Sequence, residues 1–320
     1  MNRKFKDSLN VLVYGDIDKL KVNSNHHFFD QLSCVSDKMT QNPKTIAELN
    51  DYILKGKYTH VVIPDEHFHR LNDSLEKCVV PVVELLGDHW IPWAIERKKE
   101  YIQKNGIKHA FVFSERFHES YKNIVNFHPI LTGYDSSTFF NQNKERKIDV
   151  LISGAMKNHE FWVYPVRNWL ADILPEIGIK EGINIQIHVH PGRVLKKGEE
   201  KKTKEYANVL NQAKIATGGS SFWRLPLKKL YEIPACGTIL LSDLPLEDSA
   251  FFKGKIMEIK PGKINFKSYA DNLRKDIMNV LENYEEFQQK LQPFRTENDR
   301  FLRSYEGRAL EMRRILKSIK

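Results

Sequence analysis

The chain has 320 residues, enough for two domains of ordinary size, and its 41% hydrophobic and 28% charged residues are typical of a soluble globular protein. Its formal charge is +9 and its pI is near 9.2. This excess favours anionic partners such as sugar nucleotides, lipid head groups or nucleic acid. Nucleic acid is the weakest of these, because the sequence has no recognised nucleic-acid motif and no Arg-rich run interleaved with aromatic residues.

The cysteines and the apolar runs indicate the compartment. Cys34, Cys78 and Cys236 are an odd number without the spacing of a metal site, which favours a reducing environment over a disulfide framework. No apolar run is long enough to cross a bilayer, and the N-terminus does not resemble a signal peptide. We therefore expect a cytoplasmic protein, and peripheral contact with a membrane surface stays open.

The first part of the chain alternates short apolar runs with helical stretches. Buried strands are predicted at residues 10–14, 60–63, 79–86 and 110–113, with helices at 25–35 and 114–121. This alternation is typical of a Rossmann-like parallel sheet. Ligands of such sheets bind beyond the carboxyl ends of the strands, so Asp16 and the pair Asp88-His89 are expected to face a cleft.

A second alternating unit begins at Lys147. Strands are predicted at residues 148–153, 183–189, 214–216, 238–241 and 255–259, and helices at 164–174 and 206–213. The polar run 141–146 before this unit reads as an exposed linker. From Tyr269 to Lys320 the pattern is helical and is broken near Pro293.

The stretch from Ala216 to Asp243, ATGGSSFWRLPLKKLYEIPACGTILLSD, carries the strongest indication of a site. It is predicted to form a Gly218-Gly219 turn, a basic loop, and a helix that opens at Pro226 and exposes N–H groups to an anion. Cations surround this start and one acid follows: Arg224, Lys228, Lys229 and Glu232. The pattern suits a nucleotide diphosphate with Glu232 on the ribose hydroxyls, and equally an ordinary surface helix with solvated lysines.

Further candidates follow other predicted strands of this unit. Gly154 permits close backbone approach, and Arg193, near His190, lies where a diphosphate would sit, unless it forms a surface ion pair. Arg167, in the first turn of the next helix, is a candidate that could equally cap local structure. Alternate histidines at His67 and His69, and at His188 and His190, could supply two metal ligands each, but no third ligand accompanies them.

The segment YEIPACGTILLSD resembles the part of GT-B glycosyltransferases in which a Glu-bearing helix, an Ala-Cys-Gly turn and a strand hold the sugar nucleotide. The resemblance is to bacterial family 1-like, CgeB-type (spore-maturation-protein-like) enzymes. In many retaining relatives two Glu residues bracket seven others; Glu232 matches the second, whereas Arg224 stands at the first. The resemblance therefore implies a ribose ligand at Glu232 but leaves the donor sugar and the stereochemistry open.

The same resemblance extends to domain organisation. The segment FHPILTGYDSSTFF is similar to the interdomain turn of GT-B enzymes, with Gly133, Asp135 and Phe139 at the matching positions. It implies an α/β fold of two Rossmann-like domains facing a cleft: an acceptor domain at 1–140, a nucleotide-sugar domain at 147–275, and helices at 276–320 that cross back to the first domain. It also implies catalysis without a bound metal or cofactor.

Asp88 and His89, just beyond the end of a predicted strand, are the candidate catalytic residues for the acceptor. A carboxylate or imidazole beyond a strand end can take the proton of an acceptor hydroxyl, although such residues at a helix start are also common caps. We expect a transferase that moves a sugar from a nucleotide sugar to a hydroxyl of a glycan, lipid-linked or protein acceptor in polysaccharide or glycoconjugate synthesis. The alternatives are a non-catalytic glycan- or nucleotide-binding module and a polyol-phosphate transferase of GT-B-like architecture.

Overall fold

The computed structural model describes residues 9–15, 26–32, 43–64, 71–87, 92–114, 116, 118–154, 163–189, 199–260 and 266–320. These residues belong to two compact units. Unit 1 consists of the chain up to Thr132 together with Tyr305–Lys320, and unit 2 is Gly133–Ser304. Each unit contains a five-stranded parallel sheet with helices packed on it, which confirms the expected α/β class.

The sheet of unit 1 is ordered as its strands occur along the chain, β1-β2-β3-β4-β5. All four strand pairs are parallel. The strands are β1 (Val11–Val13), β2 (His60–Ile63), β3 (Val82–Leu86), β4 (His109–Val112) and β5 (Asn126–Pro129). The sequence pattern missed β5, whose four residues are exposed or half-buried and so lack the continuous apolar run of a central strand.

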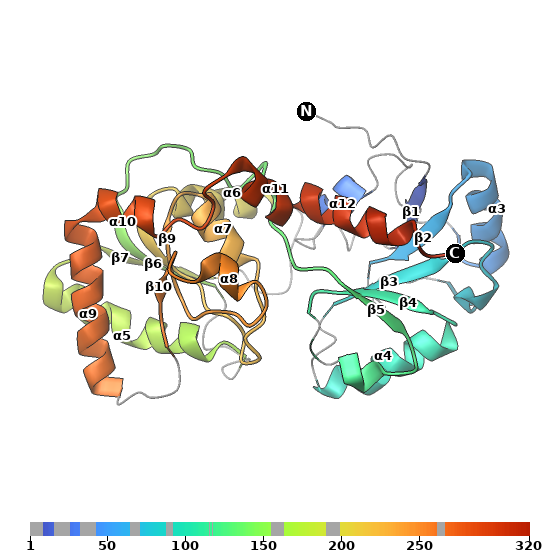
Figure 1. Ribbon diagram of the computed structural model, residues 1–320, viewed down its shortest axis with the longest axis horizontal. Helices are drawn as coiled ribbons and strands as arrows, with labels where there is room; N and C mark the ends of the chain where they lie inside the picture. Colours follow the sequence, from blue (N-terminus) through green and yellow to red (C-terminus); the bar gives the residue numbers. More distant parts are fainter. Residues whose placement is uncertain are drawn as a thin grey trace. The chain divides into compact units, whose positions relative to one another are not determined.

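Helices cover both faces of this sheet, for different reasons. Because every connection advances in the same direction and crossovers are right-handed, the last element before each new strand lies on one face. These are α3 (Ile46–Gly56), α4 (Pro92–Lys104) and the 3-10 turns η2 (Leu75–Lys77) and η3 (His118–Tyr121). The opposite face is covered by α2 (His26–Leu32) and by α12 (Tyr305–Leu316) from the far end of the chain (Figure 1).

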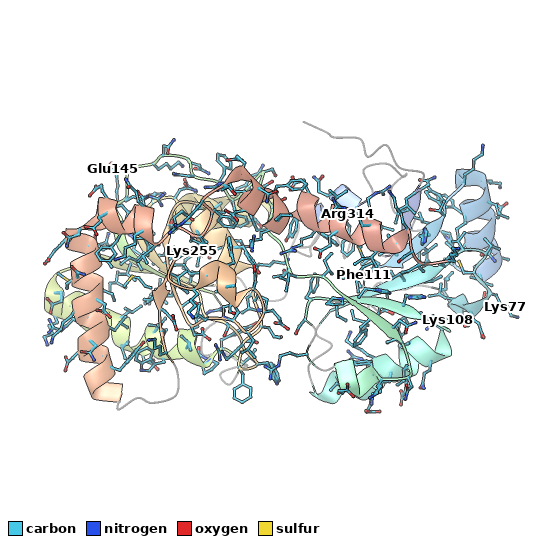
Figure 2. The ribbon with its side chains drawn as sticks, in the orientation of Figure 1. Lys77, Lys108, Phe111, Glu145, Lys255 and Arg314 are labelled. Carbon is cyan, nitrogen blue, oxygen red and sulfur yellow. The ribbon has the colours of Figure 1, made fainter. Side chains whose placement is uncertain are left out.

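Phe111 shows how the sheet separates interior from surface. Its ring is fully buried between the sheet and the α2–α12 layer, whereas Lys77 and Lys108 project from unit 1 into solvent (Figure 2). Arg313 of α12 is also fully buried and donates hydrogen bonds to the carbonyl oxygens of Leu9 (2.8 Å) and Leu32 (3.2 Å). These bonds satisfy backbone acceptors that burial would otherwise leave unpaired, so they fasten α12 to unit 1.

The sheet of unit 2 has the order β10-β9-β8-β6-β7, also fully parallel. Its strands are β6 (Ile148–Gly154), β7 (Ile185–Val189), β8 (Ala213–Thr217), β9 (Ile239–Ser242) and β10 (Met257–Glu258). The chain runs outwards from β6 to β7, returns across β6 to form β8, and then continues in the opposite direction. The winding therefore reverses between β6 and β8.

This reversal places helices on both faces. Helices α5 (Pro165–Glu181) and α9 (Phe266–Glu282) pack on one face, and α6 (Glu199–Leu210), α7 (Lys229–Ala235) and α8 (Ser249–Phe252) pack on the other (Figure 1). A crevice forms where helices on either side of such a reversal diverge, and it opens beyond the carboxyl ends of the strands. In unit 2 this rule places the expected crevice at the ends of β6 and β8.

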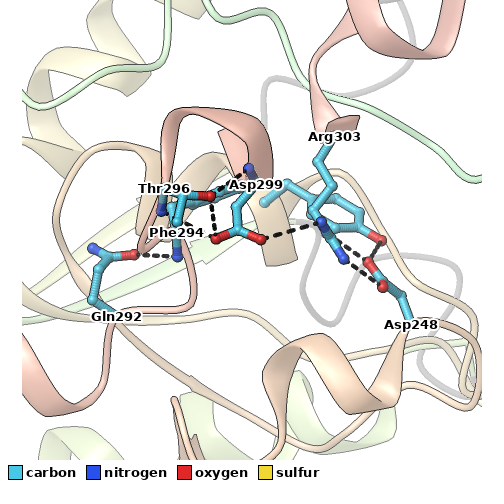
Figure 3. A network of polar contacts seen from close by, with 7 residues as sticks. Asp248, Gln292, Phe294, Thr296, Asp299 and Arg303 are labelled. Carbon is cyan, nitrogen blue, oxygen red and sulfur yellow. Dashed lines mark hydrogen bonds and ion pairs between the residues drawn. The ribbon is translucent and has the colours of Figure 1, made fainter. Parts of the chain in front are cut away.

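The helical end of unit 2 is broken more often than the single interruption near Pro293 that was predicted. The segment forms α9, α10 (Tyr284–Lys290) and α11 (Glu297–Arg303) before the chain re-enters unit 1. Thr296 and Asp299 cap α11 reciprocally, and Arg303 forms a bidentate ion pair with Asp248 at 2.8 and 2.9 Å (Figure 3). This network fixes α11 next to α8.

The predicted linker 141–146 is largely exposed, but its last residue is not a free surface cation. The guanidinium of Arg146 donates to the carbonyl oxygens of Leu210, Ala213 and Cys236 and to the Thr238 hydroxyl, at 2.8–3.0 Å. These acceptors come from the amino ends of β8 and β9 and their approaches. Arg146 therefore ties the segment to unit 2 at the edge of the sheet away from the crevice.

Candidate functional site

The ends of β6 and β8 are joined by side-chain hydrogen bonds. The backbone N–H of Ser153 donates to Thr217 Oγ1 at 3.1 Å, and Ser153 Oγ donates to the Thr217 carbonyl at 3.3 Å. Each strand then runs into glycine: Gly154 has a φ of 116°, and Gly219 has a φ of 103°. Non-glycine residues rarely adopt this conformation, so both turns depend on glycine for their shape.

Arg167 fills the space between these two turns. It lies in the first turn of α5, is only 3% exposed, and donates from Nε to the Gly218 carbonyl (3.1 Å) and from Nη2 to the Gly219 carbonyl (3.4 Å). A Cβ atom at Gly154 would lie 2.8 Å from Nη1, closer than real Cβ contacts allow. Gly154 is therefore needed for the guanidinium to reach the reversal point, whereas Gly219 is needed for its positive φ.

The charge of Arg167 is only partly compensated. Burial lowers the pKa of its guanidinium, while Tyr164, Tyr206, Asp243 and Glu232 act in the opposite direction. The Tyr164 ring lies 4.3 Å from the guanidinium carbon, in a cation–π contact. A buried cation held by carbonyl dipoles and a ring, with carboxylates nearby, is a fixed positive charge beside the crevice.

Helix α7 supplies the other charges, but it begins later than the sequence predicted. It starts at Lys229 rather than at Pro226, because Arg224 takes a left-handed φ of 58° and residues 225–227 are irregular. With only seven residues, α7 offers no strong helix-end field for an anion. The predicted helix start at Pro226 is therefore wrong, and we assign the positive charge offered to an anion to side chains.

Lys228, Lys229 and Glu232 are half-buried on this short helix. Burial lowers the pKa of Lys228 to about 8 and that of Lys229 to about 7, and the nearby Glu232 charge opposes both shifts. Burial also raises the pKa of Glu232, against the pull of Lys229, Lys228 and Arg167. Arg167, Lys228 and Lys229 carry three positive charges against the one negative charge of Glu232. Because burial makes this excess positive charge costly, the group favours a ligand that is an anion.

Tyr206 is a central residue of the site that sequence reasoning missed. This buried residue of α6 places its ring under Lys229, whose Nζ lies 3.8 Å from the ring centroid, and its hydroxyl lies 3.1 Å from Ser153 Oγ. His188 from the end of β7 also stacks on the Tyr206 ring, at 5.2 Å between ring centroids. Only knowledge that α6 packs across β6 and β8 would have singled out this tyrosine.

A second unpredicted pair fixes the loop after β8. Ser220 donates its backbone N–H (2.8 Å) and its hydroxyl to the carboxylate of Asp243, which follows β9. The Ser242 hydroxyl in turn accepts from the Gly219 N–H at 3.0 Å. Burial raises the pKa of Asp243, and its hydrogen bonds with Ser220 work against that increase. The glycine turn is thus held from β9 as well as from α5.

Arg224 does not point into this group in the way the sequence suggested. Its Nε and Nη2 both donate to the Leu244 carbonyl, at 3.1 and 2.8 Å, and the residue is exposed. The contact braces the loop against the segment after β9. Arg224 is therefore a loop brace in this structure, even though its charge acts on Asp243.

Several predicted site residues lie outside the described parts of the chain: Asp88, His89, His190 and Arg193. Asp16, His67 and His69 lie outside them as well. Among the residues that are described, no group of three or more His, Cys, Asp or Glu side chains is arranged to hold a metal ion. None of the helices in those same stretches is long and apolar enough to cross a membrane.

The residues that the structure brings together are called here the switch-point cluster: Arg167, Tyr206, Lys228, Lys229 and Glu232. Of these, all but Tyr206 were predicted, together with Gly154, which leaves room for Arg167, and Gly219, whose positive φ shapes the turn after β8. Three cations and one carboxylate around a glycine-lined strand edge can bind a multiply charged anion and a vicinal diol at the same time.

Comparison with known proteins places this fold among glycosyltransferases of known structure. HepE of Anabaena, solved in complex with UDP, superposes with a TM-score of 0.56 and 9% identity, over 97% of this chain and 100% of that one. A glycosyltransferase from Rickettsia africae gives a TM-score of 0.55 and 9% identity, over 98% and 99%. At such identity the similarity concerns the fold.

The pneumococcal O-GlcNAc transferase GtfA, in complex with UDP and GlcNAc, superposes with a TM-score of 0.54 and 9% identity. The match covers 85% of this chain and only 60% of GtfA, so the chain spans part of that larger enzyme. No protein-family model matches the sequence, and no curated protein does.

Proposed function

We propose that the protein is a glycosyltransferase that moves a sugar from a nucleotide-sugar donor to a hydroxyl acceptor. The observation that carries the proposal is the switch-point cluster, in which Arg167, Lys228 and Lys229 gather around Glu232 at the strand ends of unit 2. The fold neighbours HepE and GtfA, which hold UDP, support a nucleoside diphosphate as the group bound there.

The cluster fits the charge changes of glycosyl transfer. When the bond between the anomeric carbon and the diphosphate oxygen breaks, negative charge develops on the departing nucleoside diphosphate, and Arg167 and Lys229 would stabilise it. Glu232, as a carboxylate, would accept hydrogen bonds from two ribose hydroxyls. The acceptor oxygen forms the new bond to the anomeric carbon, and its proton passes to a base.

For the rest of the molecule we retain the roles predicted from the sequence and from the resemblance. Residues 1–140 would hold the acceptor, with Asp88 or His89 as the base, and residues 147–275 would hold the donor in a GT-B arrangement braced by residues 276–320. His190, Arg193 and Arg224 would lie near the diphosphate. In its most specific form, the proposal is a cytoplasmic, CgeB-type enzyme of glycan or glycoconjugate synthesis. This enzyme would act on a glycan, lipid-linked or protein acceptor and would need no metal cofactor.

One observation favours a second candidate, a non-catalytic nucleotide- or glycan-binding module. Arg224 occupies the position of the first Glu of the resembling enzymes, and its guanidinium is bound to the Leu244 carbonyl. Turnover separates the two candidates. Release of free sugar or transferred product from UDP-, GDP-, CDP- or TDP-linked donors by the purified protein identifies the enzyme, and binding without any turnover identifies the module.

Nucleotide binding is tested first by thermal shift with UDP, GDP, CDP, TDP and CMP, followed by calorimetry with the best ligand. Glu232→Gln keeps the shape of the side chain but removes its charge, and we expect an affinity loss of about tenfold or more, or roughly 1.4 kcal/mol. Glu258→Gln, at an exposed carboxylate on β10, is the matched control and should bind like the wild type. No shift with any nucleotide, or equal loss in both variants, would contradict the proposal.

A further inference from the structure

Two neighbouring loops of unit 2 expose large apolar side chains. Phe222, in the loop after β8, is 61% exposed, and Leu246, in the loop after β9, is 44% exposed. The two loops are directly paired, because the Leu246 N–H donates to the Arg224 carbonyl at 2.8 Å. We call Phe222 and Leu246 the apolar patch. Neither side chain belongs to the switch-point cluster.

The backbone beneath the patch is held rigidly. The Phe222 N–H donates to the Val163 carbonyl at 2.7 Å, and the Phe222 ring packs edge-to-face on Trp223 at 5.8 Å between centroids. Arg224 keeps a left-handed φ of 58° and makes two hydrogen bonds to Leu244. The loop that carries Phe222 is therefore held in a strained backbone conformation with its apolar side chain in solvent. Because the loop is already ordered, docking it costs less conformational entropy.

The charge around the patch is positive. Arg224 is exposed, follows Phe222 by two residues and accepts at its carbonyl from the Leu246 N–H, and the acids that follow Leu246 are drawn inwards. Asp248 is paired with Arg303 at 2.8 Å, and Oε2 of Glu247 is buried. The whole chain carries +9. The surface presented here consists of an aromatic ring, an aliphatic side chain and a cation.

This combination distinguishes between two kinds of partner. A sugar ring or a nucleobase would use the aromatic face and would gain little from Leu246, which has no stacking surface. The boundary of an anionic bilayer accepts aromatic and aliphatic side chains together and attracts the adjacent cation. We propose that the apolar patch docks unit 2 on an anionic membrane surface, with Phe222 and Leu246 entering the interface and Arg224 beside the lipid phosphates.

The proposal does not depend on the transferase assignment, because it uses no residue of the switch-point cluster and its two apolar side chains have no role in nucleotide binding. Two apolar side chains and one exposed cation give weak and reversible binding rather than permanent anchoring. Binding should therefore require anionic lipid and should weaken as salt is raised from about 0.1 M to about 0.5 M.

Co-sedimentation of the full chain with phosphatidylglycerol–phosphatidylcholine vesicles tests this, with pure phosphatidylcholine vesicles as the lipid control. The double variant Phe222→Ser/Leu246→Ser should need at least about ten times more lipid for half-maximal binding. Ile179→Ser is the matched protein control, because Ile179 on α5 is 87% exposed yet lies outside the patch, and it should sediment like the wild type. Circular dichroism verifies that all three proteins are folded.

The result that would overturn the proposal is vesicle binding that is absent in the wild type or unchanged in the double variant. Sedimentation that the double variant keeps, together with a raised KM for a soluble acceptor, would instead identify the patch as an acceptor platform. Nucleotide thermal shifts are recorded on the same samples. Vesicle binding without a nucleotide shift would support membrane docking and remove the transferase assignment. A nucleotide shift without vesicle binding would support the transferase assignment and overturn membrane docking.

Discussion

Units 1 and 2 are built from the same parts but are wound differently. Each has five parallel strands, yet the strands of unit 1 follow chain order, whereas those of unit 2 reverse direction between β6 and β8. The reversal separates α5 from α6 and opens the strand ends to Arg167 and Tyr206. The comparison teaches that strand order, rather than strand composition, decides where charged side chains gather at the strand ends.

One buried arginine in each unit illustrates the difference between unit 1 and unit 2. Arg313 in unit 1 and Arg167 in unit 2 both donate to two backbone carbonyls and are almost inaccessible. Arg313 fastens a helix to the sheet. Arg167 instead holds the glycine turn beyond β8, where the carboxylates of Glu232 and Asp243 act on its charge. Arg313 has a structural role only, whereas Arg167 has a structural role and also belongs to the candidate site.

Substitution of these two arginines should give the largest effect. Arg167→Ala leaves two buried carbonyls unpaired and removes a cation from the site, so we expect the free energy of unfolding to fall by about 2–4 kcal/mol. Nucleotide affinity should fall about 100-fold, which calorimetry at low temperature measures on the folded fraction.

Arg313→Ala is the control in the other unit. It should destabilise the protein by a similar amount, measured by urea unfolding, and leave nucleotide affinity unchanged. If both variants lost nucleotide binding equally, or if Arg167→Ala bound normally, the distinction between the two units would be lost.

The next largest effect should come from pH. In the free protein burial lowers the pKa of Lys229 to about 7, and a bound diphosphate should raise it again, so binding takes up a proton. A group whose pKa is raised in the complex contributes affinity that is present below the pKa of the free protein and lost as pH rises towards the pKa of the complex. Affinity should therefore fall about tenfold or more between about pH 7 and about pH 9.

Calorimetry in buffers of different ionisation enthalpy measures this proton uptake directly. Lys229→Arg keeps the cation charged over the same range and should flatten the profile. An affinity that does not change with pH in the wild-type protein would show that Lys229 is already fully charged or does not contact the ligand.

Removal of the Tyr206 hydroxyl should have a moderate effect. Tyr206→Phe keeps the ring under Lys229 but loses the contact with Ser153 Oγ, so the end of β6 is held less firmly. We expect nucleotide affinity to fall about threefold, whereas Tyr206→Leu, which also removes the cation–π contact, should cost about tenfold. Equal affinities in the two variants would show that the ring contributes nothing to the position of Lys229.

The smallest effect should come from the network next to α7. Tyr231 donates its hydroxyl to Asp248 Oδ2 at 3.1 Å, and Asp248 is already paired with Arg303. Tyr231→Phe removes one hydrogen bond and should lower the free energy of unfolding by about 1 kcal/mol, with nucleotide affinity within about twofold of wild type. A loss of affinity much larger than the loss of stability would show that this network positions Glu232.

Much of the fold could be predicted from the sequence because most strands are continuous apolar runs. The runs near Val11, Val62, Leu85 and Leu151 are buried on both sides of a sheet, so their apolar composition alone predicts these strands. Strand β5 could not be found in this way, because it lies at a sheet edge with half-exposed side chains. The order of the strands in each sheet could not be predicted from the sequence, because both units show the same alternation of strands and helices along the chain.

The candidate site was predictable to the extent that it lies in one stretch of sequence. Lys228, Lys229 and Glu232 share α7, so their types and spacing indicated the chemistry. Tyr206 and Asp243 enter from other elements, and only the packing of α6 and the order of β8 and β9 bring them near. Arg224 was predicted on charge, but its conformation and its bonds to Leu244 depend on the loop around it.

The central claim, that the reversal in unit 2 forms the nucleotide site and that unit 1 does not, can be tested by hydrogen–deuterium exchange with saturating UDP. The claim predicts slower exchange in the peptides that contain Ser153–Gly154, Gly218–Ser221 and Lys229–Cys236, which surround the switch-point cluster. The peptides of β1–β5 should change little. Protection confined to unit 1, or no protection in these three segments at a UDP concentration that saturates binding, would contradict it.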